Sequence, residues 1–262
     1  MMLMLSGKVV SLADSESQKP LDFSEVELKL KKAMSYKKDG KFESALMMID
    51  DALSFDENCT EAWILKGIIL STLGNCTESL KCLDNVLNLK PDCADAWHLK
   101  GAVFASMNSH EQAINCYRKA IEINPEEIEI RTNLGSSLQK QRRFNEALVC
   151  FKNVLEQRPN DFLVLYRVGL MQGNLSDYEK AIETFDKVLK LKNDFADALI
   201  AKGVMLARLG RSEEAKKCAD QVLEMKGKAE EGIPLFNSNS ASQDIQRDYR
   251  AAQMRLKNRF SS

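Results

Sequence analysis

Cysteine and histidine are the side chains with the greatest capacity for chemistry in this sequence. Seven cysteines and two histidines occur among the 262 residues. Thiolates and imidazoles are the usual ligands of zinc, and a close pair of them can act as nucleophile and base. Six of the cysteines fall into two evenly spaced sets, in which successive members differ by one or two steps of the same 34-residue interval: Cys82, Cys116, Cys150 and Cys218, and then Cys59 and Cys93. Such long, equal spacings indicate a chain that repeats one structural unit.

The same spacing argues against a metal site. Equivalent places in successive units are one helix pair apart, which is too far for two thiolates to share a metal ion. The sequence also has no C-x-x-C pair, so reduced cysteines that pack as small apolar residues are expected. Neither His98, at a position that can face a ligand, nor His110, at a packing position, belongs to a nucleophile–base pattern. We therefore expect no metal, no cofactor and no enzymatic activity.

A 34-residue repeat organises most of the chain. The same interval separates Trp63 from Trp97, each of which stands in an Ala-Trp pair followed by Lys-Gly. With Trp63 at position 4, six units follow without insertion: 26–59, 60–93, 94–127, 128–161, 162–195 and 196–229. A helix pair cannot bury its apolar face alone, whereas stacked pairs form a continuous core.

The columns of the repeat predict a helix, a tight turn and a second helix in each unit. Position 8 is always small: Ala33, Gly67, Gly101, Gly135, Gly169 and Gly203. Apolar residues at positions 4, 8 and 11 and at positions 20, 24 and 27 form two helical stripes. Position 15 requires a residue that ends the first helix, and it holds Gly40, Gly74, Asn108, Arg142, Ser176 and Gly210. Position 32, where proline ends the second helix of three units, holds Glu57, Pro91, Pro125, Pro159, Asn193 and Gly227.

This pattern resembles the tetratricopeptide repeat family, whose signature is W-x2-L-G-x2-Y, then A-x3-F, then P. The matching residues are Trp63, Gly67, Pro91, Trp97, Gly101, Ala113, Tyr117, Pro125, Gly135, Ala147, Phe151, Pro159, Gly169, Ala181, Phe185, Gly203 and Ala215. The resemblance implies an all-α, right-handed α-solenoid of six tandem helix-turn-helix repeats. Position 7 departs from the family, because four units have lysine where leucine is preferred. We expect the lysine stem to cover apolar surface while the ammonium group reaches water.

The resemblance also implies a concave groove, lined by a second stripe on the first helix of each unit. The residues expected there are Leu30, Met34, Ile64, Ile68, His98, Ala102, Thr132, Asn133, Ser136, Tyr166, Arg167, Leu170, Ile200 and Val204. Packing between neighbouring helices is an equally good interpretation of many of them. Of the lysine, asparagine and arginine pattern with which some members grip a peptide carboxylate, only Asn133 and Arg167 are present. These two are expected to hold a peptide backbone or one carboxylate.

Three segments lie outside the repeats. We expect residues 1–25 to be flexible, residues 230–242 to form a linker, and residues 243–262 to contain a basic amphipathic helix. The apolar stripe of that helix is Ile245, Tyr249, Ala252, Leu256 and Phe260. The helix could cap the last repeat, fill the groove or dock elsewhere, and contact with an anionic membrane is the least favoured of these outcomes.

Composition bounds the remaining possibilities. A net charge of −1 argues against a nucleic-acid partner, and no apolar run approaches the roughly 20 residues of a membrane span. The expected reduced thiols favour a cytoplasmic location. The leading hypothesis is a scaffold that binds a peptide or helix of an unknown partner protein in the groove. The alternative is a self-regulated or self-assembling adaptor, whose C-terminal helix docks in its own or a neighbouring groove.

Overall fold

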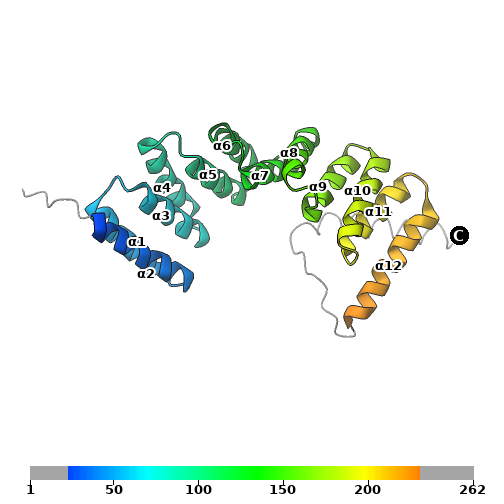
Figure 1. Cartoon of the computed structure of the whole chain (residues 1–262), viewed down its shortest axis with the longest axis horizontal. Helices are drawn as coiled ribbons and strands as arrows, with labels where there is room; N and C mark the ends of the chain where they lie inside the picture. Colours follow the sequence, from blue (N-terminus) through cyan, green and yellow to red (C-terminus); the bar gives the residue numbers. More distant parts are fainter. Residues whose placement is uncertain (1–22, 231–262) are drawn as a thin grey trace, which may run out of the picture. The chain divides into compact units, whose positions relative to one another are not determined.

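The fold consists of helices throughout the part of the chain that the computed structural model describes, residues 23–230. Residues 1–22 and 231–262, which contain most of the predicted flexible segment, the linker and the basic helix, lie outside the described residues. The twelve helices of residues 23–230 (Figure 1) are α1 (Phe23–Lys38), α2 (Phe42–Phe55), α3 (Thr60–Thr72), α4 (Cys76–Leu89), α5 (Ala94–Ser106), α6 (His110–Ile123), α7 (Ile128–Lys140), α8 (Phe144–Gln157), α9 (Phe162–Asn174), α10 (Tyr178–Leu191), α11 (Ala196–Arg208) and α12 (Ser212–Glu230). The predicted all-α fold is confirmed for these residues. None of their helices is long and apolar enough to cross a membrane.

Helix boundaries follow the 34-residue period of the sequence. The helices α3, α5, α7, α9 and α11 begin at the first residue of a unit, and α2, α4, α6, α8, α10 and α12 begin at position 17 of one. The two ends of the described chain differ. Helix α1 begins at Phe23, ahead of the expected first unit, and α12 runs to Glu230 through Gly227. In contrast, α4, α6 and α8 end two residues before Pro91, Pro125 and Pro159, which lack the backbone N–H that a helix needs.

The turn inside each helix pair contains one residue with a left-handed backbone. Three of these residues are glycines, namely Gly40, Gly74 and Gly210, with φ of 73°, 81° and 75°. The other three are Asn108, Arg142 and Ser176, with φ of 58°, 59° and 66°. Arg142 and Ser176 carry a Cβ in a region that costs most L-residues about 1–2 kcal/mol. The repeat therefore imposes this turn even where the residue type does not favour it.

The described chain divides into two compact units, residues 23–99 and residues 100–230, with α5 contributing to both. In the first unit α1 packs on α2, α3 on α4, and α2 on α3. Its core contains Ala33, Ile49 and Ile69, which are fully buried. In the second unit the same order of contacts runs from α6 to α12.

Close approach within helix pairs depends on the small residue at position 8. A Cβ added to Gly101, Gly135 or Gly169 would lie 2.6, 2.8 or 2.5 Å from the ring of the aromatic residue at position 24. Those rings belong to Tyr117, Phe151 and Phe185, which are among the largest fully buried side chains of the described residues. Burying such a ring stabilises the fold by about 1.5–3 kcal/mol. The glycines are therefore present because the rings occupy the space of a side chain.

Two of the lysines at position 7 form ion pairs between neighbouring repeats. Lys66 Nζ of α3 lies 2.6 Å from Asp50 Oδ1 of α2, and Lys202 Nζ of α11 lies 2.6 Å from Asp186 Oδ1 of α10. We expected these ammonium groups only to reach water, but each of the two also pairs with a carboxylate. At Lys66 and Lys202 a carboxylate at position 25 of the preceding unit therefore explains why lysine replaces leucine.

Candidate functional site

The inner-face residues expected from the sequence fall in both units. In residues 23–99, Met34 is exposed, whereas the side chains of Leu30, Ile64, Ile68 and His98 are half-buried. Leu30 packs against the core of α1 and α2, and Ile64 packs against the cluster that contains Val86 and Ala96. Part of the surface of Leu30 and part of the surface of Ile64 are therefore used in helix packing.

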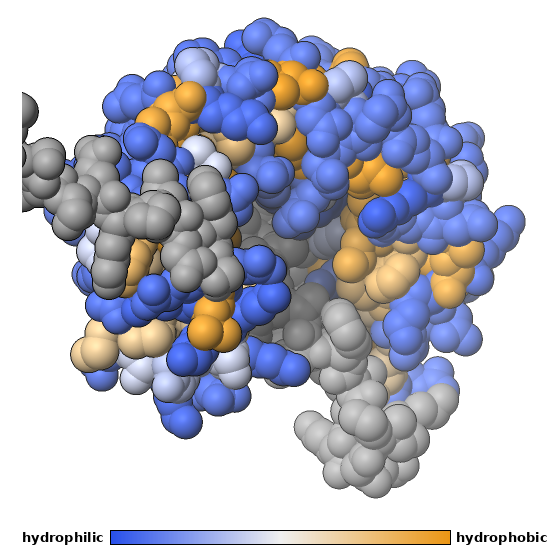
Figure 2. All heavy atoms as spheres, turned by 60° about the vertical axis from the view of Figure 1, so that its left-hand side comes forward, coloured by the Kyte–Doolittle hydropathy of each residue, from blue (hydrophilic) through white to orange (hydrophobic). Residues whose placement is uncertain are grey.

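Eight further expected residues in residues 100–230 are half-buried. They are Ala102 on α5, Thr132, Asn133 and Ser136 on α7, Arg167 and Leu170 on α9, and Ile200 and Val204 on α11. This degree of exposure allows a side chain to pack on its neighbours and still meet a ligand. Figure 2 shows one face of the molecule, on which hydrophilic residues predominate and hydrophobic residues appear in separate groups.

Tyr166 is an exception, because it is buried in the core. Its side chain is 3% exposed, and its ring lies edge-on to Phe195 at 5.0 Å and tilted against Phe185 at 5.9 Å between centroids. Phe162 adds a further edge-on contact with Phe195 at 5.5 Å. The expectation that Tyr166 offers a surface to a ligand is wrong, because these phenylalanines enclose its ring. Its hydroxyl has no hydrogen-bond partner among the described residues, and burial raises the pKa of Tyr166.

A polar cluster lies where α7 and α9 face each other. Arg167 Nη1 donates a hydrogen bond to Ser136 Oγ at 3.2 Å, and its guanidinium lies 5.8 Å from the centroid of the Phe151 ring. Ser136 Oγ in turn donates to the carbonyl of Thr132 at 2.8 Å. This chain of contacts holds the guanidinium in one place between the two helices.

Arg167 has a charge that the cluster does not neutralise. Among residues 23–230, no carboxylate forms an ion pair with it, and Asp161 acts on it only at longer range. Burial lowers the pKa of Arg167, because desolvation disfavours the charged guanidinium relative to its neutral form. A half-buried guanidinium has five N–H donors, and an anion that accepted some of them would recover part of the desolvation cost. The site is therefore suited to a carboxylate.

Helix starts and ends place these side chains. Asp161 caps α9 by accepting hydrogen bonds from the backbone N–H of Leu163 and Val164, each at 3.1 Å. Such a cap fixes the first turn of the helix and the direction of the side chains that follow. Thr132 Oγ1 donates to the Ile128 carbonyl at 2.9 Å, which keeps its hydroxyl on the helix.

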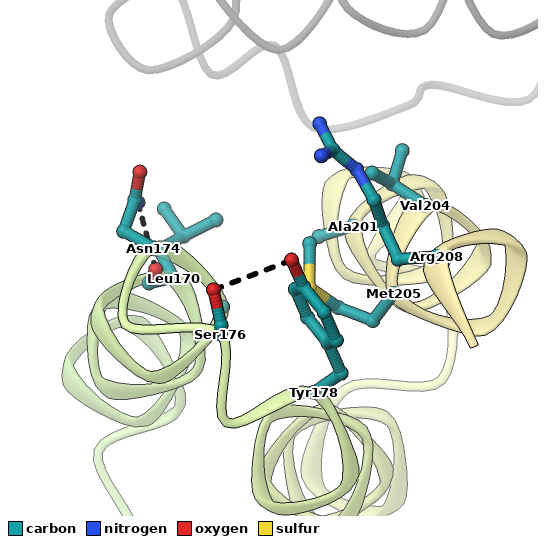
Figure 3. Close-up of a pocket in the computed structure, with 9 residues that line it drawn as sticks. Leu170, Asn174, Ser176, Tyr178, Ala201, Val204, Met205 and Arg208 are labelled. Atoms are coloured by element: carbon teal, nitrogen blue, oxygen red, sulfur yellow. Dashed lines mark hydrogen bonds between the residues drawn. The ribbon is translucent and has the colours of Figure 1, made fainter.

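A pocket of about 280 Å³ lies between α9 and α11, at the end of these helices where the turns begin (Figure 3). Leu170 of α9 and Val204 and Met205 of α11 supply apolar walls, with Ala201 beside them. Tyr178 stands between the two helices, and its hydroxyl donates to Ser176 Oγ at 3.4 Å. Other lining residues are Gly173, Asn174 and Arg208.

The pocket brings together two expected residues and several that sequence reasoning missed. Leu170 and Val204 were expected at the inner face, and Gly173 stands at position 12 of the same stripe, but Met205 and Arg208 were not expected there. Gly173 is the residue that opens the pocket, because an added Cβ would lie 2.7 Å from Met205 Sδ. The available signal was the charge of Arg208 at position 13, one turn beyond Val204 on the same helix.

The cysteines carry no sign of a reactive site. All seven are thiols rather than halves of disulfides, and five of them are buried. Burial raises the pKa of Cys59, Cys82 and Cys218, and that of Cys150 to about 11, so these thiols are protonated at neutral pH. Among the described residues, no group of His, Cys, Asp and Glu side chains could hold a metal ion.

Comparison with protein families gives two matches. The family of the cytochrome c-type biogenesis protein H TPR domain matches residues 82–199, and the tetratricopeptide repeat matches residues 60–93 and 196–228. Together these matches cover residues 60–228, which is more than half of the chain. No curated protein matches the sequence.

Solved structures resemble this fold at low sequence identity. YrrB, a TPR protein with an unusual peptide-binding site, is 22% identical over 68% of this chain and 92% of its own, with a TM-score of 0.63. MamA of Desulfovibrio magneticus RS-1 is 21% identical over 65% of this chain and 97% of its own, with a TM-score of 0.60. Pseudomonas aeruginosa pilF is 14% identical over 87% of this chain and 98% of its own, with a TM-score of 0.66. At these identities the likeness concerns the fold.

Proposed function

The chain belongs to the tetratricopeptide repeat family, and from this premise we propose that it is a non-catalytic scaffold that binds a peptide or helix of a partner protein. The proposed binding face in residues 100–230 is the inner face of α7, α9 and α11. It includes Thr132, Asn133, Ser136, Arg167, Leu170, Ile200 and Val204. Further residues are proposed to contact a partner peptide. In residues 23–99 they are Leu30, Met34, Ile64, Ile68 and His98, and in residues 100–230 Ala102 of α5 is another.

The observation that carries this proposal is the environment of Arg167. A half-buried guanidinium with no ion-pair partner among the described residues lies one turn before the half-buried apolar side chain of Leu170 on α9. An apolar surface with one fixed charge suits a peptide, because side chains cover the apolar part and a carboxylate meets the charge. The reduced thiols support the proposal of a cytoplasmic location.

The experiment is a selection of displayed random peptides against the full chain. Ile200→Glu and Arg167→Gln should each weaken binding of the selected peptides by roughly 1–3 kcal/mol, measured by fluorescence polarisation. Leu191→Glu is the matched control, since Leu191 is exposed on α10 and lies outside the proposed face. If the control weakens binding as much as Ile200→Glu, this face is not the binding site.

The second candidate, docking of the C-terminal helix in the groove, has an electrostatic argument against it. Residues 243–260 carry five basic and two acidic residues, so their net charge is 5 − 2 = +3. The proposed face presents Arg167 and, at its end, Arg208. Like charges oppose docking there. A chain that ends at residue 242 should therefore bind the selected peptides as tightly as the full chain, whereas stronger binding would favour self-docking.

A further inference from the structure

The pocket between α9 and α11 is large enough to hold an amino-acid side chain. Its volume of about 280 Å³ lies just below the roughly 300–1,000 Å³ of sites for drug-sized ligands. Leu170, Val204 and Met205 give it apolar walls. These walls can take an aliphatic or methionine side chain, while Asn174, Ser176, Tyr178 and Arg208 supply the polar part of the lining.

The open side of the pocket carries a positive charge. In Figure 3 the side chains of Arg208 and Asn174 extend to the same side of the pocket. Arg208 is exposed and has no ion pair within residues 23–230. In contrast, Arg211, in the turn that follows α11, is paired with Glu214 at 2.7 Å. Arg208 is thus available to a carboxylate brought by a ligand.

Resting on the function proposed above, we propose that this pocket is the anchor subsite for an acidic segment of a partner protein. One aliphatic or methionine side chain of that segment enters between Leu170 and Val204. A neighbouring carboxylate pairs with Arg208, and a second carboxylate further along the segment pairs with Arg167. The partner is therefore defined chemically as an acidic peptide with an apolar residue beside one of its acidic residues.

The spacing of the two arginines sets the spacing of the acids. Arg167 occupies position 6 of its helix and Arg208 position 13, and α9 contacts α11. Seven helical residues correspond to a displacement of about 10 Å along the helices. The distance between the two helix axes contributes a perpendicular displacement of about 8–10 Å. An extended peptide advances about 3.3 Å per residue. The two acids should therefore lie about three to five residues apart.

The test begins with the same displayed library of random peptides, selected against the full chain. The proposal expects enriched peptides to carry two or more acidic residues at that spacing, with Leu, Ile or Met beside one of them. Enrichment of basic amphipathic peptides that resemble residues 243–260 would overturn it. Failure to enrich any peptide would overturn both this proposal and the proposed function.

Two variants then examine the pocket with the best acidic peptide as the labelled probe. Gly173→Leu fills the pocket and is compatible with folding, because the nearest atoms are the flexible end of Met205. It should weaken binding about tenfold or more. Arg208→Gln should weaken binding about three- to tenfold and reduce the dependence of affinity on salt between about 50 and 500 mM NaCl. Lys187→Gln is the control, because it removes one exposed charge of α10 that does not line the pocket.

The outcomes separate the two proposals. If Arg167→Gln weakens binding but Gly173→Leu and Arg208→Gln match the control, the inner face binds peptides and the anchor proposal is wrong. Thermal unfolding of each variant checks that the fold is intact. A Gly173→Leu variant that unfolds would leave the decision to Arg208→Gln and its salt dependence, which do not alter the packing of the pocket.

Discussion

The helix pairs α9/α10 and α11/α12 follow one another and share the 34-residue plan, yet their interiors are filled differently. In the first pair, Gly169 lies under the ring of Phe185, and a Cβ there would be 2.5 Å from the ring. In the second pair, the nearest atom to a Cβ on Gly203 is Cys218 Cβ, at 3.4 Å. Glycine at position 8 therefore has a different role in each pair. It is a steric requirement in the first pair and only a loss of helix stability in the second.

The largest difference is expected when the filling residue is removed. Phe185→Ala should lower the free energy of unfolding by about 3–5 kcal/mol, because it leaves a cavity in the place of a fully buried ring. Cys218→Ala removes one sulfur atom from a smaller contact and should cost about 1 kcal/mol. Urea unfolding of both variants measures the two values. Equal losses would mean that the two pairs are packed equally well.

A smaller difference is expected from the glycines themselves. Gly169→Ala should destabilise the protein by about 1–3 kcal/mol, because the Phe185 ring must move. Gly203→Ala should be neutral or stabilise it by up to about 1 kcal/mol, since alanine favours the helix and meets only ordinary contacts. Thermal unfolding followed by circular dichroism compares them. The comparison fails if both substitutions shift the melting temperature in the same direction and to the same extent.

The smallest difference concerns the turns. Ser176 and Gly210 occupy the same place in the two pairs and both have a left-handed backbone, with φ of 66° and 75°. Ser176→Gly should raise the free energy of unfolding by about 0.5–1 kcal/mol, because glycine adopts this backbone without a steric penalty. Gly210→Ser should lower it by a similar amount. A loss of stability in Ser176→Gly would show that the Ser176 contact with Tyr178 outweighs the backbone term.

Much of the fold could be predicted because it is written in local patterns. The prolines, the small residues at position 8 and the turn residues at position 15 each act within one helix pair, so the sequence period locates them. The environment of Tyr166 could not be predicted in this way. Its stripe position suggested exposure, but Phe162, Phe185 and Phe195 meet around it only in three dimensions.

The candidate site was less accessible to sequence reasoning for the same reason. The pocket depends on the absence of a side chain at Gly173 and on the path of Met205 from another helix. The partner of Lys202 was also missed, because Asp186 belongs to the preceding repeat and lies 16 residues earlier. Contacts between repeats join positions such as 7 and 25, which are far apart within the sequence of a single repeat.

The glycine beneath each central ring has a consequence for how this chain can change through inheritance. A mutation that enlarges Gly101, Gly135 or Gly169 meets a ring at once, whereas a mutation that shrinks the ring first creates space. The repeat at residues 26–59 holds the other solution, with Ala33 and Ile49 in the corresponding positions. Passage from one solution to the other is therefore easier in one order, with the ring lost before the glycine. Although positions 8 and 24 of each such repeat belong to different helices, we expect them to change together during evolution.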